Sequence, residues 1–212
     1  MSRRPYKSLR RSEQAADTRA QVIAAARAVF VEDGWKKATI AGVARRAGVS
    51  AETIYASFGN KPQLLLAVVQ ATARRREPDV AVVDQPGAQA VAAAPDQRAA
   101  LKAFASDVAN LLEAAAPVVA VVREAARSEP ELAQVYEAIH RGRRENFARV
   151  AMALTQKGAL RQGIDGATVV AEVWRLASPE LYLLMTGIEG LSQAAYAAWL
   201  EQTLGRLLLQ TP

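Results

Sequence analysis

Residues 41–61, AGVARRAGVSAETIYASFGNK, read as two short amphipathic segments that meet at Gly48. A supporting helix, a tight turn and a second helix with a free outer face are what a helix-turn-helix needs to enter the major groove of DNA. The outer face of the second segment carries mostly short side chains and one tyrosine, which suits close docking on a duplex: Ala51, Glu52, Thr53, Tyr55 and Ala56. A compact helical corner in an alanine-rich bundle would have the same periodicity, so the spacing alone leaves both interpretations open.

The chain offers little for catalysis or metal binding. It contains one histidine, His140, and no cysteine, which excludes disulfides, thiolate metal sites and cysteine nucleophiles. It has no glycine-rich phosphate loop, and its carboxylates and serines stand in no recognisable catalytic or metal-ligand spacing. We therefore predict that the protein is not an enzyme and has no cofactor and no metal site.

Positive charge is concentrated in the first third of the 212-residue chain. Residues 1–61 contain twelve Lys and Arg against five Asp and Glu, a net charge of +7, whereas residues 62–212 have a net charge of −1. This asymmetry favours a polyanionic partner for the N-terminal part, with a solvated charged surface as the alternative. Nucleic acid is favoured over a membrane, because no basic amphipathic helix with a Trp/Phe face accompanies the charge.

The distribution of apolar residues along the chain predicts a cytoplasmic protein without a membrane span. The basic start has no apolar signal-peptide core, and the longest apolar run, LLEAAAPVVAVV, is interrupted by Glu113 and Pro117. The absence of cysteine is compatible with a reducing compartment.

Apolar residues recur at three- and four-residue spacing, and alternating β-branched runs are scarce, which predicts an all-α protein. A first helix is expected over 17–33, with Asp17 as its N-cap and Gly34 as its stop. Thr39 and Ser50 are expected to cap the two short helices that follow. Further helices are expected over 62–76 and near 96–114, 117–128, 130–157, 166–177, 178–186 and 192–210, several of them starting at Asp165, Ser178 or Ser192.

Residues 17–70 resemble the N-terminal domain of the tetracycline-repressor (TetR) family of bacterial transcription regulators. The resemblance rests on an ordered set of residues: Ala-Ala-x-x-x-Phe followed by Gly34 and Trp35, then Thr39, Ala47-Gly48-Val49-Ser50, Thr53-Ile54-Tyr55, Phe58, Lys61 and Leu64-Leu65. It implies an N-terminal three-helix helix-turn-helix domain joined to a C-terminal helical domain that binds a small molecule and forms a dimer. We expect a basic arm at 1–16, the DNA-binding domain at 17–76, a linker at 77–97 and the C-terminal domain at 98–212.

The resemblance also implies roles for individual residues. Thr39 and Ser50 would bind phosphate oxygens at helix N-termini, and the Tyr55 phenol would do the same, with core packing as the alternative for Tyr55. Lys61 would pair with another phosphate. The base-facing positions would be Ala51, Glu52, Thr53 and Ala56, of which Thr53 can touch a thymine methyl group and Glu52 can accept from a cytosine amino group.

This sequence departs from the family pattern at three places. Glu52 stands where many members have glycine, and Ala56 and Ser57 replace longer or aromatic polar side chains. Gly42 lies inside a helix, where glycine costs ~1 kcal/mol relative to alanine. The arm would compensate by entering a minor groove or following the backbone, with an unstructured solubilising tail as the alternative: Arg3, Arg4, Arg10 and Arg11.

In the C-terminal part, abundant Ala and Val predict an apolar pocket and a largely apolar small-molecule effector. The candidate contacts are aromatic and soft side chains that would otherwise pack in the core: Phe104, Tyr136, His140, Phe147, Met152, Trp174, Tyr182 and Met185. A polar effector head would be oriented by Arg123, Glu124 and Arg127, unless these lie on solvated helix faces. The candidate dimer seam is a leucine stripe, with burial inside one subunit as the alternative: Leu200, Leu204, Leu207 and Leu208.

Taken together, these features predict a homodimeric, ligand-responsive DNA-binding regulator, a repressor that binds a pseudo-palindromic operator in double-stranded DNA. The alternative is an all-α dimeric scaffold or adaptor that does not read DNA. Glu52, Ala56 and Ser57 are the residues that keep this alternative open.

Overall fold

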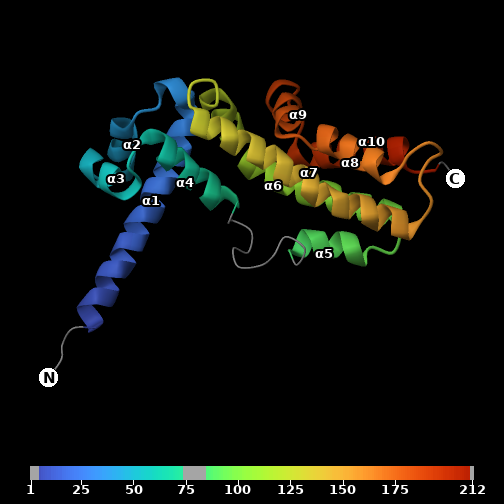
Figure 1. Cartoon of the computed structure of the whole chain (residues 1–212), viewed down its shortest axis with the longest axis horizontal. Helices are drawn as coiled ribbons and strands as arrows, with labels where there is room; N and C mark the ends of the chain where they lie inside the picture. Colours follow the sequence, from blue (N-terminus) through green and yellow to red (C-terminus); the bar gives the residue numbers. More distant parts are fainter. Residues whose placement is uncertain (1–4, 74–84, 211–212) are drawn as a thin grey trace. The chain divides into compact units, whose positions relative to one another are not determined.

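The structure, a computed structural model, describes residues 5–73 and 85–210. Within these residues the regular elements are all helices, and an isolated β-bridge joins Leu160 to Leu209 (Figure 1). The prediction of an all-α fold is therefore confirmed. The chain divides into two compact units: unit 1 is Met1–Thr72 with Val121–Gln134, and unit 2 is Ala73–Ala120 with Val135–Pro212.

Unit 1 is built from four N-terminal helices and a helical hairpin. The helices are α1 (Pro5–Lys37), α2 (Ile40–Ala47), α3 (Ala51–Phe58) and α4 (Lys61–Ala73), and the hairpin joins the end of α6 (Gln97–Ala125) to the start of α7 (Pro130–Lys157). Its core consists of apolar side chains that recur at helical spacing, including Val22, Ala26, Phe30, Val43, Ile54, Leu64, Leu65 and Val68. Burial of these faces holds the short helices α2 and α3, which are too short to be stable alone in water.

The start of α1 differs from the expectation. The helix begins at Pro5, so Asp17 is an exposed residue inside it and is not its N-cap. Proline is favoured in the first turn of a helix, and no glycine or further proline interrupts the chain before Gly34. Part of the expected basic arm is therefore helical backbone, whereas Arg3 and Arg4 lie outside the described residues.

Unit 2 contains α5 (Pro86–Ala93), residues 97–120 of α6, most of α7, α8 (Gly166–Leu176), α9 (Pro179–Leu183), the π-helix η2 (Leu184–Ile188) and α10 (Gln193–Leu208). The N-caps predicted at Asp165, Ser178 and Ser192 are confirmed, because each side chain accepts a hydrogen bond from the backbone three residues later. The described part of the expected linker holds α5. The Lys157 ammonium donates to the carbonyl groups of Ala92 at 2.8 Å and Ala94 at 2.6 Å and so caps the end of this helix.

Helix α6 runs unbroken through Pro117, where two helices were expected. Proline removes one backbone hydrogen bond, and the buried residues on both sides of Pro117 keep the 29-residue helix together. By length and composition alone α6 would be able to cross a membrane. Core packing accounts for its apolar character, because side chains such as Leu101, Phe104, Val108 and Leu112 are buried inside unit 2.

Candidate nucleic-acid interface

The segment from Thr39 to Phe58 forms a helix, a tight turn and a second helix. Gly48 ends α2 with a φ of +69°, the left-handed conformation that glycine adopts without strain, and its amide donates to the carbonyl of Ala44. On α3, Ile54 and Phe58 face the core and are 1% and 8% exposed. The remaining face of α3 is open to solvent.

Both N-caps predicted for these helices are confirmed. Oγ1 of Thr39 accepts from the amide of Gly42 at 3.0 Å, and Oγ of Ser50 accepts from the amide of Thr53 at 3.2 Å. The hydroxyls of Ser50 and Thr53 also lie 3.1 Å apart. Each cap leaves other amides of the first helical turn without an intrahelical partner, and such amides suit an anion.

The outer face of α3 carries the predicted base-facing residues. Glu52, Tyr55 and Ala56 are exposed, whereas Ala51 and Thr53 are half-buried. Tyr55 is 54% exposed, and within residues 5–73 and 85–210 its hydroxyl has no hydrogen-bond partner. Core packing of Tyr55 is thereby excluded, and its phenol can donate to an external acceptor.

The Glu52 carboxylate is held at the N-terminus of α3. Interaction with its own backbone amide, and then with the Ser50 side chain, lowers the pKa of Glu52 below its ordinary value. The residue is therefore ionised at neutral pH and places a negative charge beside the amides of the first turn.

Lys61 begins α4 and contacts Trp35. Its Nζ donates to the carbonyl oxygen of Trp35 and lies 4.1 Å from the centre of the Trp35 ring. Burial lowers the pKa of Lys61 below its ordinary value, and the carboxylates of Glu129 and Glu124 partly offset this effect. Because an ammonium group has three donors, two N–H groups besides the one bound to Trp35 are left for another acceptor.

Trp35 is fixed by contacts that the sequence did not predict. Its buried ring stacks on Phe30 with 5.9 Å between ring centres, and its backbone amide donates to Oε2 of Glu124 at 2.8 Å. Gly34 has a φ of +72°, and a Cβ at this position would lie 2.9 Å from the same carboxylate oxygen. Glu124 is half-buried in this contact, and no local pattern connects it to a residue 89 positions away.

Helix α2 is tied to α1 by an ion pair. Arg46 makes two hydrogen bonds to the Glu32 carboxylate, one of them from Nη2 to Oε1 at 2.8 Å. The pair lowers the pKa of Glu32, chiefly through the hydrogen bond from Arg46. This bidentate contact sets the angle of α2 against the helix that supports it.

Residues 22–68 match the bacterial regulatory proteins of the tetR family. Over 60 residues the chain is 42% identical to the HTH-type transcriptional regulator TtgR of Pseudomonas putida, and the alignment covers 28% of this chain and 29% of TtgR. The similarity to this family that the two matches show lies in less than a third of the chain. The relation to TtgR thus spans less than a third of that protein.

Solved structures extend the similarity of fold to most of the chain. A transcriptional regulator from Saccharomonospora viridis in complex with choline has a TM-score of 0.70 at 16% identity, covering 92% of this chain and 100% of its own. FadR from Bacillus subtilis in complex with stearoyl-CoA has a TM-score of 0.67 at 20% identity, covering 87% and 96%. At these identities the similarity establishes the fold alone.

The predicted effector contacts fall into three groups. Phe104, Phe147 and Tyr182 are buried in the core of unit 2, as is Met185, and the first two pack edge to face with 5.5 Å between ring centres. Met152 is 56% exposed and lies outside this core, so its contact with an effector stays a prediction. On α7, Met152 follows the buried residues Val150 and Ala151 and points away from the core.

The remaining three candidates, Tyr136, His140 and Trp174, lie together. The His140 ring is 4.5 Å from the Tyr136 ring and 5.8 Å from the Trp174 ring, measured between centres. Arg143 donates to Nδ1 of His140 at 2.9 Å and to the carbonyl of Trp174 at 3.1 Å. Because a guanidinium only donates, Nδ1 accepts, and the proton of the neutral imidazole is on Nε2.

A carboxylate completes this group. Oε1 of Glu180 accepts from the Tyr136 hydroxyl at 2.9 Å and lies 3.6 Å from Nε2 of His140. Burial lowers the pKa of His140, Glu180 opposes this shift, and Arg143 adds to it. We call Tyr136, His140, Arg143, Trp174 and Glu180 the His140 cluster.

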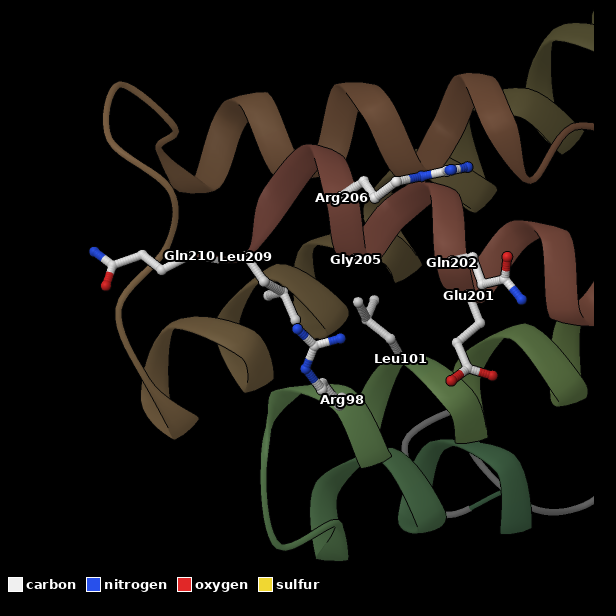
Figure 2. A pocket seen from close by; sticks show the side chains of 8 residues that line it. All are labelled: Arg98, Leu101, Glu201, Gln202, Gly205, Arg206, Leu209 and Gln210. Atoms are coloured by element: carbon white, nitrogen blue, oxygen red, sulfur yellow. The ribbon is translucent and has the colours of Figure 1, made fainter. Parts of the chain in front are cut away.

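The described residues of unit 2 form grooves at its surface. One, of about 430 Å³, is lined by His140, Arg141, Arg144, Glu145 and Trp174 and so borders the His140 cluster. Another, of about 270 Å³, lies between α6 and α10 and is lined by Arg98, Leu101, Glu201, Gln202, Gly205, Arg206, Leu209 and Gln210 (Figure 2). None of the predicted effector contacts lines the second groove.

The predicted dimer seam is wrong for three of its four leucines. Leu200, Leu204 and Leu208 are completely buried in the core of unit 2 within a single chain, so they cannot meet a symmetry mate. They recur at four-residue spacing and form the inner face of α10. Leu207 is 38% exposed and is the member of the stripe that remains accessible.

Proposed function

We propose that this protein is a sequence-specific DNA-binding transcriptional regulator that acts as a ligand-responsive repressor. In this proposal a homodimer binds a pseudo-palindromic operator in the cytoplasm, and each subunit places α3 in a major groove. Two-fold readers of this type need half-sites about 34–36 Å apart, so the separation of the two α3 helices would decide whether the operator is bound.

The exposed face of α3 carries the proposal. Ile54 and Phe58 anchor the helix, and Tyr55 directs its phenol outward from the same helix. Together with the caps at Thr39 and Ser50, this gives an anchored helix flanked by groups that suit phosphate. The net charge of +7 in residues 1–61 provides the long-range attraction to DNA.

Different residues would take different parts of the duplex. Phosphates would be bound by Thr39, Ser50, Tyr55 and Lys61. Such contacts fix the position and register of the protein on the duplex but carry no sequence information. The base-facing positions would be Ala51, Glu52, Thr53 and Ala56. Of these, Thr53 has a hydroxyl that is already shared with Ser50 at 3.1 Å, so its methyl group is the part best suited to a thymine.

The effector is proposed to be a small, largely apolar molecule that binds unit 2. Two structural neighbours were solved with small molecules, stearoyl-CoA and choline, which supports a ligand role for this fold. The groove beside the His140 cluster is the candidate site, because it joins the aromatic face of Trp174 to His140 and two arginines. An apolar body would lie on Trp174, and a polar end would be held by Arg141 or Arg144.

The test of DNA reading is selection of duplexes from a random pool by the full-length protein. We expect enrichment of a pseudo-palindrome and a steep loss of affinity for it as salt increases, because phosphate contacts release counterions. Failure to enrich any palindrome, with no sequence-dependent binding at low salt, would refute the proposal and favour the all-α dimeric scaffold.

A further inference from the structure

The C-terminal end of α6 supplies a carboxylate to the last turn of α1, which the non-helical backbone of Gly34 separates from the rest of that helix. Oε2 of Glu124 accepts from the Trp35 amide at 2.8 Å, and the next turn closes when the Ala38 amide donates to the carbonyl of Gly34 at 3.2 Å. The first amides of such a turn have no partner within it and favour a negative charge. Glu124 therefore acts as a cap supplied from a distant segment of the chain.

The shape of the turn is adapted to this carboxylate. Gly34 has a φ of +72°, and a Cβ there would come within 2.9 Å of Oε2 of Glu124. A side chain at position 34 would thus meet both backbone strain and the carboxylate that holds Trp35. The absence of a side chain lets Glu124 reach the amide.

Trp35 transmits this contact to Lys61. The carbonyl of Trp35 accepts from Nζ of Lys61, and the ring of Trp35 lies beneath the same ammonium at 4.1 Å. The buried ring of Phe30 stacks on the Trp35 ring and holds it in the core. The position of the Lys61 ammonium therefore depends on Trp35, whose backbone is held by Glu124.

Resting on the DNA-binding function proposed above, we propose that Glu124 is a positioning residue for DNA binding: through Trp35 it places the Lys61 ammonium where that group binds phosphate. Glu124 itself does not contact DNA in this role. It lies in α6, whose residues 97–120 belong to unit 2, so the residue that holds the turn is on a helix shared by both units.

A double-mutant cycle on the full-length protein tests this role. The probe is the duplex that the wild-type protein enriches from a random pool, and its dissociation constant is measured for Glu124→Ala, Lys61→Ala and the double variant. We expect each single variant to lose about tenfold in affinity and the double variant to lose about the same as Lys61→Ala alone. Residues that act through one another show such non-additive losses, whereas independent sites would lose about a hundredfold together.

Two further variants separate positioning from charge and from general destabilisation. Glu124→Gln keeps an oxygen that accepts from the Trp35 amide, so we expect it to stay within about threefold of the wild type. Glu129→Gln removes one negative charge near Lys61 but no bond to Trp35, and we expect no loss of affinity. Amide hydrogen exchange at Trp35, measured without DNA, should accelerate in Glu124→Ala but not in Glu124→Gln.

The outcomes distinguish the two proposals. A wild-type protein that binds no duplex overturns both. Two results overturn the positioning role alone, provided that the wild-type protein binds DNA. One is additive losses in the double-mutant cycle, and the other is an unchanged exchange rate of the Trp35 amide in Glu124→Ala. If Glu124→Ala does not fold, a loss of about tenfold or more in both Glu124→Gln and Glu129→Gln leads to the same rejection, because the effect then follows charge and not the bond to Trp35.

Discussion

The guanidinium of Arg19 lies 4.3 Å from the centre of the Phe58 ring, and its Nη1 donates to the carbonyl of Ser57 at 3.1 Å. Arg19 is on α1, whereas Ser57 and Phe58 form the last turn of α3. One side chain of the supporting helix thus pairs a terminal carbonyl of α3 and covers the aromatic residue that anchors it. The orientation of α3 is set from its C-terminal end as well as from the Gly48 turn.

Replacement of Arg19 by methionine should destabilise unit 1. Methionine keeps an apolar stem over Phe58 but removes the cation and the donor to Ser57, and an exposed cation–π contact contributes roughly 0.5–1 kcal/mol. We expect a decrease of about 1 kcal/mol in the free energy of unfolding, measured by urea denaturation. Arg45→Met, which removes an exposed charge on α2, is the matched control and should change stability by less than about 0.5 kcal/mol. Equal decreases in the two variants would mean that Arg19 contributes to stability only through its charge and not through its contacts with Ser57 and Phe58.

Replacement of Tyr55 by phenylalanine should weaken DNA binding without changing which duplexes are preferred. The change removes one hydroxyl that is free in the described part of the chain, and a hydrogen bond contributes about 1 kcal/mol, or roughly fivefold in affinity. The phenol is neutral, so the slope of affinity against salt should stay constant. Lys61→Ala provides the contrast, because loss of a cation should reduce this slope by about one. Unchanged affinity in Tyr55→Phe would remove Tyr55 from the phosphate contacts.

Replacement of Glu52 by glutamine should raise affinity for all duplexes. The carboxylate lies beside the first-turn amides of α3 and the Ser50 hydroxyl, where it opposes an approaching phosphate. Binding of a selected duplex and of an unrelated duplex should therefore both tighten, by roughly the same factor. Should preference change at a single base pair instead, Glu52 reads a base and is not merely a local anion.

The helix-turn-helix was predictable because its determinants are local. The caps at Thr39 and Ser50, the glycine at position 48 and the inward face of α3 all follow from residues within four positions of one another. The start of α1 was predicted too late because aspartate is a common N-cap residue, which makes Asp17 a candidate cap. An aspartate can equally lie inside a helix that begins earlier in the chain. The break expected at Pro117 was wrong for the related reason that core packing outweighs one lost hydrogen bond.

Contacts between distant segments were not predictable. Nothing near Glu124 indicates that its carboxylate lies on the Trp35 amide, and nothing near Lys61 shows that Trp35 accepts from it. The leucine stripe of α10 illustrates the same limit, because an apolar stripe predicts burial but not whether the partner is the same chain or a second copy. Only the fold distinguishes Leu204, which is completely buried, from Leu207, which is 38% exposed.

The two leucines of α10 therefore make a matched pair. Leu204→Ala should lower the free energy of unfolding by about 2–5 kcal/mol, because it leaves a cavity in the core of unit 2. Leu207→Ala removes the same atoms from a partly exposed position and should cost less than about 1 kcal/mol. Urea denaturation of both variants at the same protein concentration measures the difference. Similar losses would indicate that Leu204 and Leu207 are equally buried in solution.

Stability should depend on pH through His140. Burial lowers the pKa of His140 below its ordinary value near 6.5, so the unfolded chain binds a proton more readily than the folded one. The stability gained from the neutral ring is complete above about pH 6.5 and is lost as the pH falls below that value. His140→Gln keeps an acceptor for Arg143 and does not titrate. We expect the difference in free energy of unfolding between the wild type and His140→Gln to shrink from pH 7.5 to pH 5, in urea denaturations at both values. Because the carboxylates outside the His140 cluster keep the same surroundings in both proteins, a difference that stays constant would show that His140 is protonated as easily in the folded chain as in the unfolded one.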